Sequence, residues 1–251
     1  MQILSMVEKE PSPEIVRGSS PASWGPAGAY IEGELGALYL LALLTGNRAP
    51  GLPDARVVSV RSEQGFKLDD LVVSGAGSAG DFILEIQSKR DITFSPSDSV
   101  YQDVASQIAR SAVGSVPEDR HLLGIATQRT SRKISGAYQD VLKWARTADS
   151  ATAFFNRIGA KGVASKDMRD FVATTRKHLI AGGIADDDHA IWSLLRRMLI
   201  LEFDFEATVP IARTYGQALA RVALADEGCR PCRGAVEPAD RPVDQDRDHW
   251  R

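Results

Sequence analysis

The segment LDDLVVSGAGSAGDFILEIQSK, residues 68–89, contains the pattern that decides the fold. In DFILEIQSK (81–89), apolar and polar side chains alternate, which is the period-two pattern of a half-buried strand. The run LDDLVVS (68–74) is also typical of a strand, and the glycine-rich residues between the two runs are typical of a turn. The segment therefore predicts a β-hairpin.

The glycines of this loop also match a dinucleotide-binding motif. Gly75, Gly77 and Gly80 have the spacing GxGxxG. That motif works only where the loop opens a helix whose N-terminus receives the phosphates. A strand follows here, so the glycines indicate a hairpin loop rather than a nucleotide site.

The flanking segments predict an α/β fold, with a mixed β-sheet flanked by helices and a C-terminal helical extension. Period-3.6 patterns indicate helices, and short apolar runs between turn signals indicate further strands. The expected helices cover 30–44, 99–113 and much of 135–225, and the further strands cover 55–64 and 121–127.

Composition is that of a soluble globular protein, with 43% hydrophobic and 25% charged residues in 251. We expect a flexible N-terminal arm (1–27), a core (28–134), the helical extension (135–225) and a disordered tail (226–251). The longest apolar run is broken by Thr45 and Gly46, so we expect no membrane contact. The start lacks a secretory signal, which predicts a cytoplasmic location.

The hairpin would bring polar side chains to one end of the sheet. Asp70 lies near the start of one strand, and Gln87 and Lys89 lie near the end of the other, on one strand face. Carboxylate and amide oxygens suit Mg²⁺, and a lysine can stabilise charge that develops on a phosphate. These residues have the parts of a phosphodiesterase.

The sequence here resembles the PD-(D/E)xK nucleases. LDDLVV, a hairpin loop and LEIQSK, between an acidic helix (GAYIEGELGALYLLALLTG) and a second helix, are similar to the Mrr-type variant that has Gln in place of the acid. They are also similar to the N-terminal double-stranded-DNA nuclease domains of bacterial antiphage effectors. The resemblance covers about residues 28–130. It implies a restriction-endonuclease-like fold and cleavage of double-stranded DNA that depends on Mg²⁺ or Mn²⁺.

The resemblance also implies roles for particular residues. Asp70 matches the metal-binding aspartate, with Asp69, on the opposite strand face, as the alternative. Gln87 takes the position of the usual acid, where it would hold the metal through its carbonyl oxygen, and Lys89 takes that of the lysine.

Further acids could supply the charge that the neutral Gln87 lacks. Glu34, or else Glu32, matches the first-helix acid, and Glu85 lies one strand period before Gln87. Each has a simpler interpretation: acids are common in the first turn of a helix, and a polar strand face is commonly the solvated side of a sheet. On the second interpretation, Lys89 is exposed.

Other features bear on partners. Arg129, Arg132 and Lys133 follow an expected strand and could hold a DNA backbone, although a solvated surface loop is the alternative. The chain has no GxxxxGK[ST] loop, so we expect a regulatory or sensor protein to be a separate partner or a further part of a longer chain. Cutting both DNA strands requires two active sites, which predicts a homo-oligomer. The alternative function is a catalytically degenerate module of the same fold that binds nucleic acid or protein.

Overall fold

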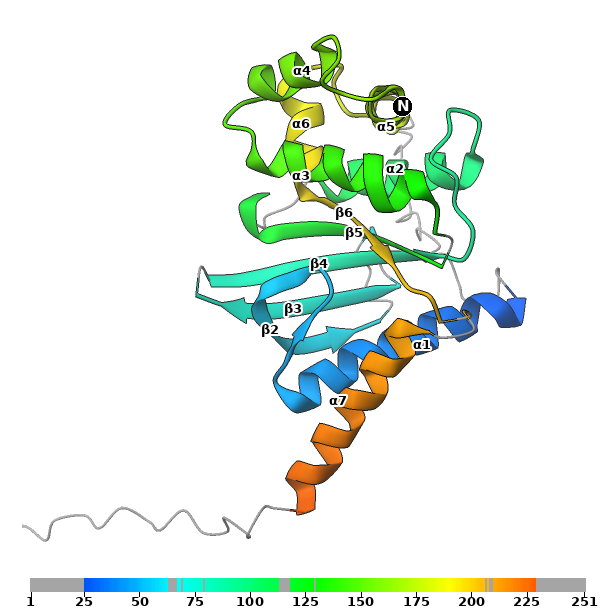
Figure 1. The fold of residues 1–251 in the computed structure, drawn as a ribbon, viewed down its shortest axis with the longest axis vertical. Helices are drawn as coiled ribbons and strands as arrows, with labels where there is room; N and C mark the ends of the chain where they lie inside the picture. The colour runs from blue at the N-terminus through cyan, green and yellow to red at the C-terminus, as the bar shows by residue number, and fades with distance from the viewer. Residues whose placement is uncertain are drawn as a thin grey trace, which may run out of the picture.

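The computed structural model describes residues 25–62, 67–68, 70–78, 80–112, 118–128, 130–205, 207 and 210–228. Over these residues the protein is a six-stranded mixed sheet with helices on both faces (Figure 1). The predicted α/β class, a mixed sheet flanked by helices, is confirmed.

The sheet runs in sequence order, β1-β2-β3-β4-β5-β6. The first four strands pair antiparallel, and β4, β5 and β6 pair parallel. The strands are β1 (Arg48–Ala49), β2 (Leu52–Arg61), β3 (Leu71–Gly77), β4 (Gly80–Lys89), β5 (His121–Thr127) and β6 (Met198–Glu202).

Helices occupy both ends of the described part of the chain and the crossover connections. Two short helical segments of other types, η2 (Glu118–Arg120) and η3 (Lys133–Tyr138), precede β5 and α3. The α-helices are α1 (Gly25–Thr45), α2 (Ser99–Ser111), α3 (Gln139–Thr147), α4 (Ala151–Gly159), α5 (Lys166–Ala181), α6 (Asp188–Arg197) and α7 (Ile211–Gly228). No described helix is both long and apolar enough to cross a bilayer.

The first and last helices extend a few residues beyond the predicted boundaries of the arm and the tail. Helix α1 begins at Gly25, inside the predicted arm, and α7 continues to Gly228, inside the predicted tail. The rest of the arm and of the tail lies outside the described residues.

The hairpin prediction is confirmed. Strands β3 and β4 pair antiparallel from Leu71↔Ile86 to Gly77↔Gly80. Gly80 has φ +111°, a conformation that residues with a Cβ rarely adopt, so glycine is required where β4 begins.

We expect Gly80→Ala to lower the free energy of unfolding by about 1–3 kcal/mol, because alanine is strained at this positive φ. Urea denaturation measures the loss. Gly159→Ala is the matched control, because its Cβ would meet no atom within 4 Å and its φ is not positive. Equal stability of the two variants would contradict this reading of the turn.

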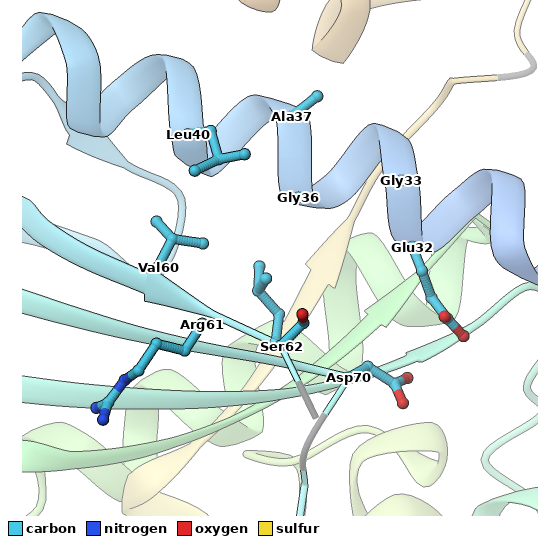
Figure 2. A pocket seen from close by; sticks show the side chains of 10 residues that line it. Glu32, Gly33, Gly36, Ala37, Leu40, Val60, Arg61, Ser62 and Asp70 are labelled. Atoms are coloured by element: carbon cyan, nitrogen blue, oxygen red, sulfur yellow. The ribbon is translucent and has the colours of Figure 1, made fainter. Parts of the chain in front are cut away.

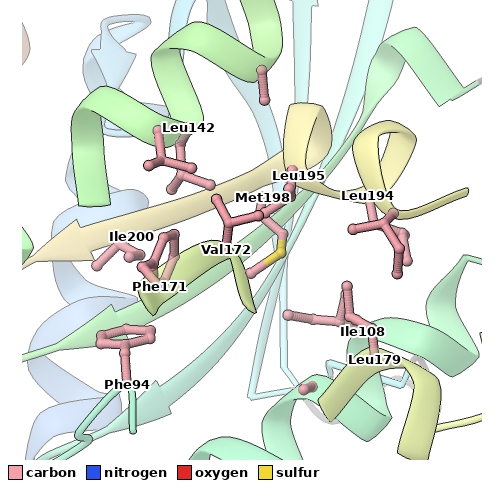
Figure 3. Close-up of a cluster of buried hydrophobic side chains, with 14 of the residues drawn as sticks. Phe94, Ile108, Leu142, Phe171, Val172, Leu179, Leu194, Leu195, Met198 and Ile200 are labelled. Carbon is pink, nitrogen blue, oxygen red and sulfur yellow. The ribbon is translucent and has the colours of Figure 1, made fainter. Parts of the chain in front are cut away.

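The sheet separates two hydrophobic clusters. Helices α1 and α7 cover one face, where Leu35 and Tyr39 pack near Leu84 and Ile86. The other face carries Leu123 and Ile125 beneath α2–α6. Figure 3 shows the second cluster, in which side chains from β6 and from several helices meet. The C-terminal part of β4 is covered on both faces, so its polar side chains Glu85 and Gln87 are buried.

One strand of the C-terminal part was not predicted. Much of 135–225 was expected to be helical and is, but Met198–Glu202 forms β6 and pairs parallel with β5. A short apolar run directly after a helix cannot be distinguished from more helix by periodicity alone. On β6, Gln139 Nε2 donates to Ile200 O at 2.9 Å and Arg146 Nη1 donates to Met198 O at 2.9 Å, so α3 satisfies two of its carbonyls.

Candidate metal site

Asp70 is held at the open end of the hairpin. It precedes β3, and continuing the register Leu71↔Ile86 by one residue sets it opposite Gln87. Gln87 Nε2 donates to Asp70 Oδ2 at 2.5 Å, and the Ser88 backbone N–H donates to the same oxygen at 2.7 Å. The structure therefore brings together two of the three residues that the hairpin pattern singled out.

The polar face of β4 is not solvated, contrary to the simpler interpretation. Glu85, Gln87 and Lys89 are only 2%, 1% and 6% exposed. In the register of β5 they lie beside Leu123, Ile125 and Thr127, on the face that the helices α2–α6 cover. Buried polar groups need partners, so this row is costly unless each member is satisfied.

Gln87 has one unsatisfied atom. Its Nε2 is used by Asp70, while its Oε1 is buried and has no hydrogen-bond partner among the described residues. An unpaired buried acceptor costs about 1–3 kcal/mol. A water or a cation beside the Asp70 carboxylate would remove that cost, and an amide oxygen is a suitable ligand for a hard cation.

Asp70 also lines a cleft of about 470 Å³ between α1 and the ends of β2 and β3. Glu32 lines the same cleft, and Figure 2 shows its carboxylate and that of Asp70 at the same end. Gly33 and Gly36 form part of the α1 wall, and a Cβ at either would meet no atom within 4 Å. The missing side chains help to keep the cleft open beside the two acids.

The structure places the two helix acids in different cavities, and Glu34, the first choice, is not in the cleft of Asp70. Glu34 Oε1 accepts from Tyr30 Oη at 2.7 Å and lies 3.3 Å from Arg213 Nη2 of α7, and it lines a different cavity. Glu32, the alternative, lies in the cleft with Asp70. The rotation of α1 about its axis determines which of the two acids lies in the cleft. That rotation is set by the side of α1 that packs on the sheet.

Glu85 belongs to a separate buried network. Its carboxylate accepts from Ser111 Oγ at 2.9 Å and lies 2.6 Å from His121 Nε2. Arg197 Nη2 lies 2.7 Å from His121 Nδ1, and Arg197 Nε donates to His121 O at 3.0 Å. An arginine can only donate, so Nδ1 accepts, Nε2 carries the proton, and the imidazole is neutral between a carboxylate and a guanidinium.

Glu85 was expected as a possible further metal acid, and the structure places its carboxylate in this network with Ser111 and His121. All of its charged members are at most 5% exposed, and burial lowers the pKa of Arg197 while Glu118 and Glu85 raise it. Its partners were missed by the sequence analysis, because His121 and Arg197 are far from Glu85 along the chain.

The basic residues after β5 are only partly described. Arg129 and the alternative aspartate Asp69 lie outside the described residues. Arg132 is exposed, and Lys133 pairs with Asp167 at 2.8 Å, an interaction that raises the pKa of Lys133. The segment follows the end of β5, where Thr127 lies opposite Lys89 in the register.

The donor set fits a cation that keeps most of its water. Among the described residues no three His, Cys, Asp or Glu side chains form a metal-binding group. The carboxylates of Glu32 and Asp70 line the cleft. The amide oxygen that has no hydrogen-bond partner among the described residues belongs to Gln87, whose Nε2 donates to Asp70. Mg²⁺ is commonly bound through one or two carboxylates with several waters, which suits this set better than a dedicated protein cage.

Comparisons with known proteins give no family. No protein-family model, no curated protein and no solved structure matches the chain.

Proposed function

We propose that the protein is a metal-dependent endonuclease that hydrolyses phosphodiester bonds of double-stranded DNA. The observation that carries the proposal is the Asp70–Gln87 contact at the end of β4, with Lys89 one strand period further on. The element order of an acidic helix, the hairpin, a helix and a parallel strand also fits the resemblance to PD-(D/E)xK nucleases.

The residues have separable tasks in this reaction. Asp70, Gln87 Oε1 and Glu32 would hold Mg²⁺ or Mn²⁺, which supplies an activated water and neutralises phosphate charge. The Ser88 N–H and Gln87 Nε2 fix the Asp70 carboxylate, so its orientation is set before substrate arrives. Lys89, in a buried position of low dielectric, would stabilise the negative charge of the pentavalent transition state.

Plasmid cleavage tests the function. We expect supercoiled DNA to be nicked or linearised in Mg²⁺ and to stay intact in EDTA. Asp70→Asn removes the charge that would hold the metal, so we expect cleavage to fall about 100-fold or more.

The two helix acids give an internal comparison. Glu32→Gln should slow Mg²⁺-dependent cleavage, whereas Glu34→Gln, which removes an acid that faces α7, should leave the rate unchanged. Initial rates at several Mg²⁺ concentrations measure both. A larger loss for the Glu34 variant would show that the wrong acid has been assigned to the site.

A second function has one observation in its favour: Gln87, the residue bonded to Asp70, is neutral and so adds no negative charge to hold a cation. The alternative is a catalytically degenerate module that binds nucleic acid or a protein. A nucleic-acid module would bind DNA with strong salt dependence and leave it uncut in Mg²⁺ or Mn²⁺.

A free nuclease is harmful to its host, which is why we propose an antiphage effector controlled by a sensor protein. A homo-oligomer would provide the two active sites that a duplex cut requires.

A further inference from the structure

A second cleft lies at the other end of the sheet. It has a volume of about 440 Å³ and is lined by residues of η2, α3 and α6, together with Leu122 of β5. The metal site lies at the C-terminal end of β4, whereas this cleft lies where the parallel strands β5 and β6 begin. The two sites are therefore separate.

Three arginines line this cleft. Arg146, Arg196 and Arg197 face it together with Glu118 and Asp119, which gives a formal excess of one positive charge. In the part of the chain that the structure describes, none of the three guanidinium groups forms an ion pair with a carboxylate. Glu118 offsets part of this charge, since it raises the pKa of Arg197, and a bound anion would balance the excess that remains.

The contacts that these arginines make use only some of their donors. Arg146 donates to the carbonyl of Met198, and Arg197 donates to His121. Arg196 lies over the ring of Trp192 at 4.6 Å. A guanidinium has five N–H donors arranged in a fork that matches the oxygens of a phosphate. Donors therefore remain for a tetrahedral oxyanion.

An apolar groove adjoins the arginines. It has a volume of about 420 Å³ and shares Leu122 and Arg146 with the cleft. Phe82, Leu199 and Leu201 line it. A ligand that extends from the cleft into this groove would combine an anionic head with an apolar body.

We propose that this cleft binds the phosphate group of a small organic phosphate, whose apolar part lies in the adjoining groove. The residue at the centre is Arg197, which is 5% exposed and is held in place by His121. A buried and oriented guanidinium binds phosphate with little loss of side-chain entropy.

Titration with phenyl phosphate and with inorganic phosphate, at constant ionic strength set with chloride, tests the proposal. We expect both to bind saturably by calorimetry and to raise the melting temperature, phenyl phosphate about tenfold more tightly because its ring enters the groove. Arg196→Gln should weaken both about tenfold, because a charge-assisted contact is lost. Leu199→Ala should weaken phenyl phosphate only.

The control is Arg157→Gln. Arg157 lies over the ring of Trp144 at 3.7 Å, a contact of the same kind as that of Arg196, but it does not line the cleft. This variant should bind both ligands as the wild type does. The ring nitrogens of His121 give a second signal, since we expect phosphate on Arg197 to shift their resonances.

Three results would overturn the proposal. The first is stabilisation that follows ionic strength alone, and the second is equal binding by the Arg196 and Arg157 variants. The third is that phenyl phosphate binds no more tightly than inorganic phosphate, which would refute the claim that the apolar part of the ligand lies in the groove. None of these readouts depends on nuclease activity.

Discussion

Replacing Lys89 with methionine is expected to reduce DNA cleavage by about 10²–10³-fold or more, while the protein stays folded. The Lys89 ammonium group is the only positive charge in the row Glu85, Gln87 and Lys89. We propose that it stabilises the negative charge of the transition state. Removing one such preorganised group costs about that factor in other enzymes. Initial cleavage rates in saturating Mg²⁺ measure the effect.

The choice of methionine follows from burial. Lys89 is 6% exposed, so Lys89→Ala would leave a cavity as well as remove a charge, contrary to the expectation of an exposed lysine. Methionine keeps the unbranched stem. Lys143→Met, at an exposed position of α3, is the control. If the Lys89 variant keeps its circular dichroism spectrum and cuts at the wild-type rate, Lys89 has no catalytic role.

Glu85→Leu is expected to lower the free energy of unfolding by about 3–5 kcal/mol, because it leaves buried polar groups without a partner. The carboxylate accepts from Ser111 Oγ and is bonded to His121 Nε2, and it balances the buried charge of Arg197 through the imidazole. Leucine would fill the space but accept no hydrogen bond. Equilibrium urea denaturation measures the loss.

Two comparisons separate the network from simple loss of charge. Glu85→Gln keeps an acceptor oxygen, so we expect a smaller loss, and Asp81→Asn, at an exposed position of the same strand, should have almost no effect. In the double variant with Arg197→Met, the losses should be less than additive because both charges are gone. Strict additivity would show that Glu85 and Arg197 are not coupled.

The hairpin could be predicted because its information is local. Alternation in 81–89 and the glycines before it determine strand, turn and register, and the register sets Asp70 opposite Gln87. The burial of that strand could not be predicted. Alternation shows that two faces differ, but not whether helices from residues 99–197 will cover the polar one.

The remaining differences also come from contacts between distant residues. Whether Glu32 or Glu34 reaches the cleft depends on the rotation of α1 about its axis, which its packing on the sheet decides. Strand β6 depends on pairing with β5, more than 70 residues earlier in the chain. The Glu85–His121–Arg197 network joins residues of three elements, and no spacing in the sequence predicts it.

Crystals soaked in Mn²⁺ test the central claim most directly, because anomalous scattering locates the ion without requiring activity. We expect one strong peak bounded by the Asp70 carboxylate and Gln87 Oε1, with Glu32 nearby, and we expect Asp70→Asn to abolish it. Electron density that shows only water there at saturating Mn²⁺, or a peak that persists in the Asp70 variant, would contradict the metal site and the nuclease mechanism that depends on it.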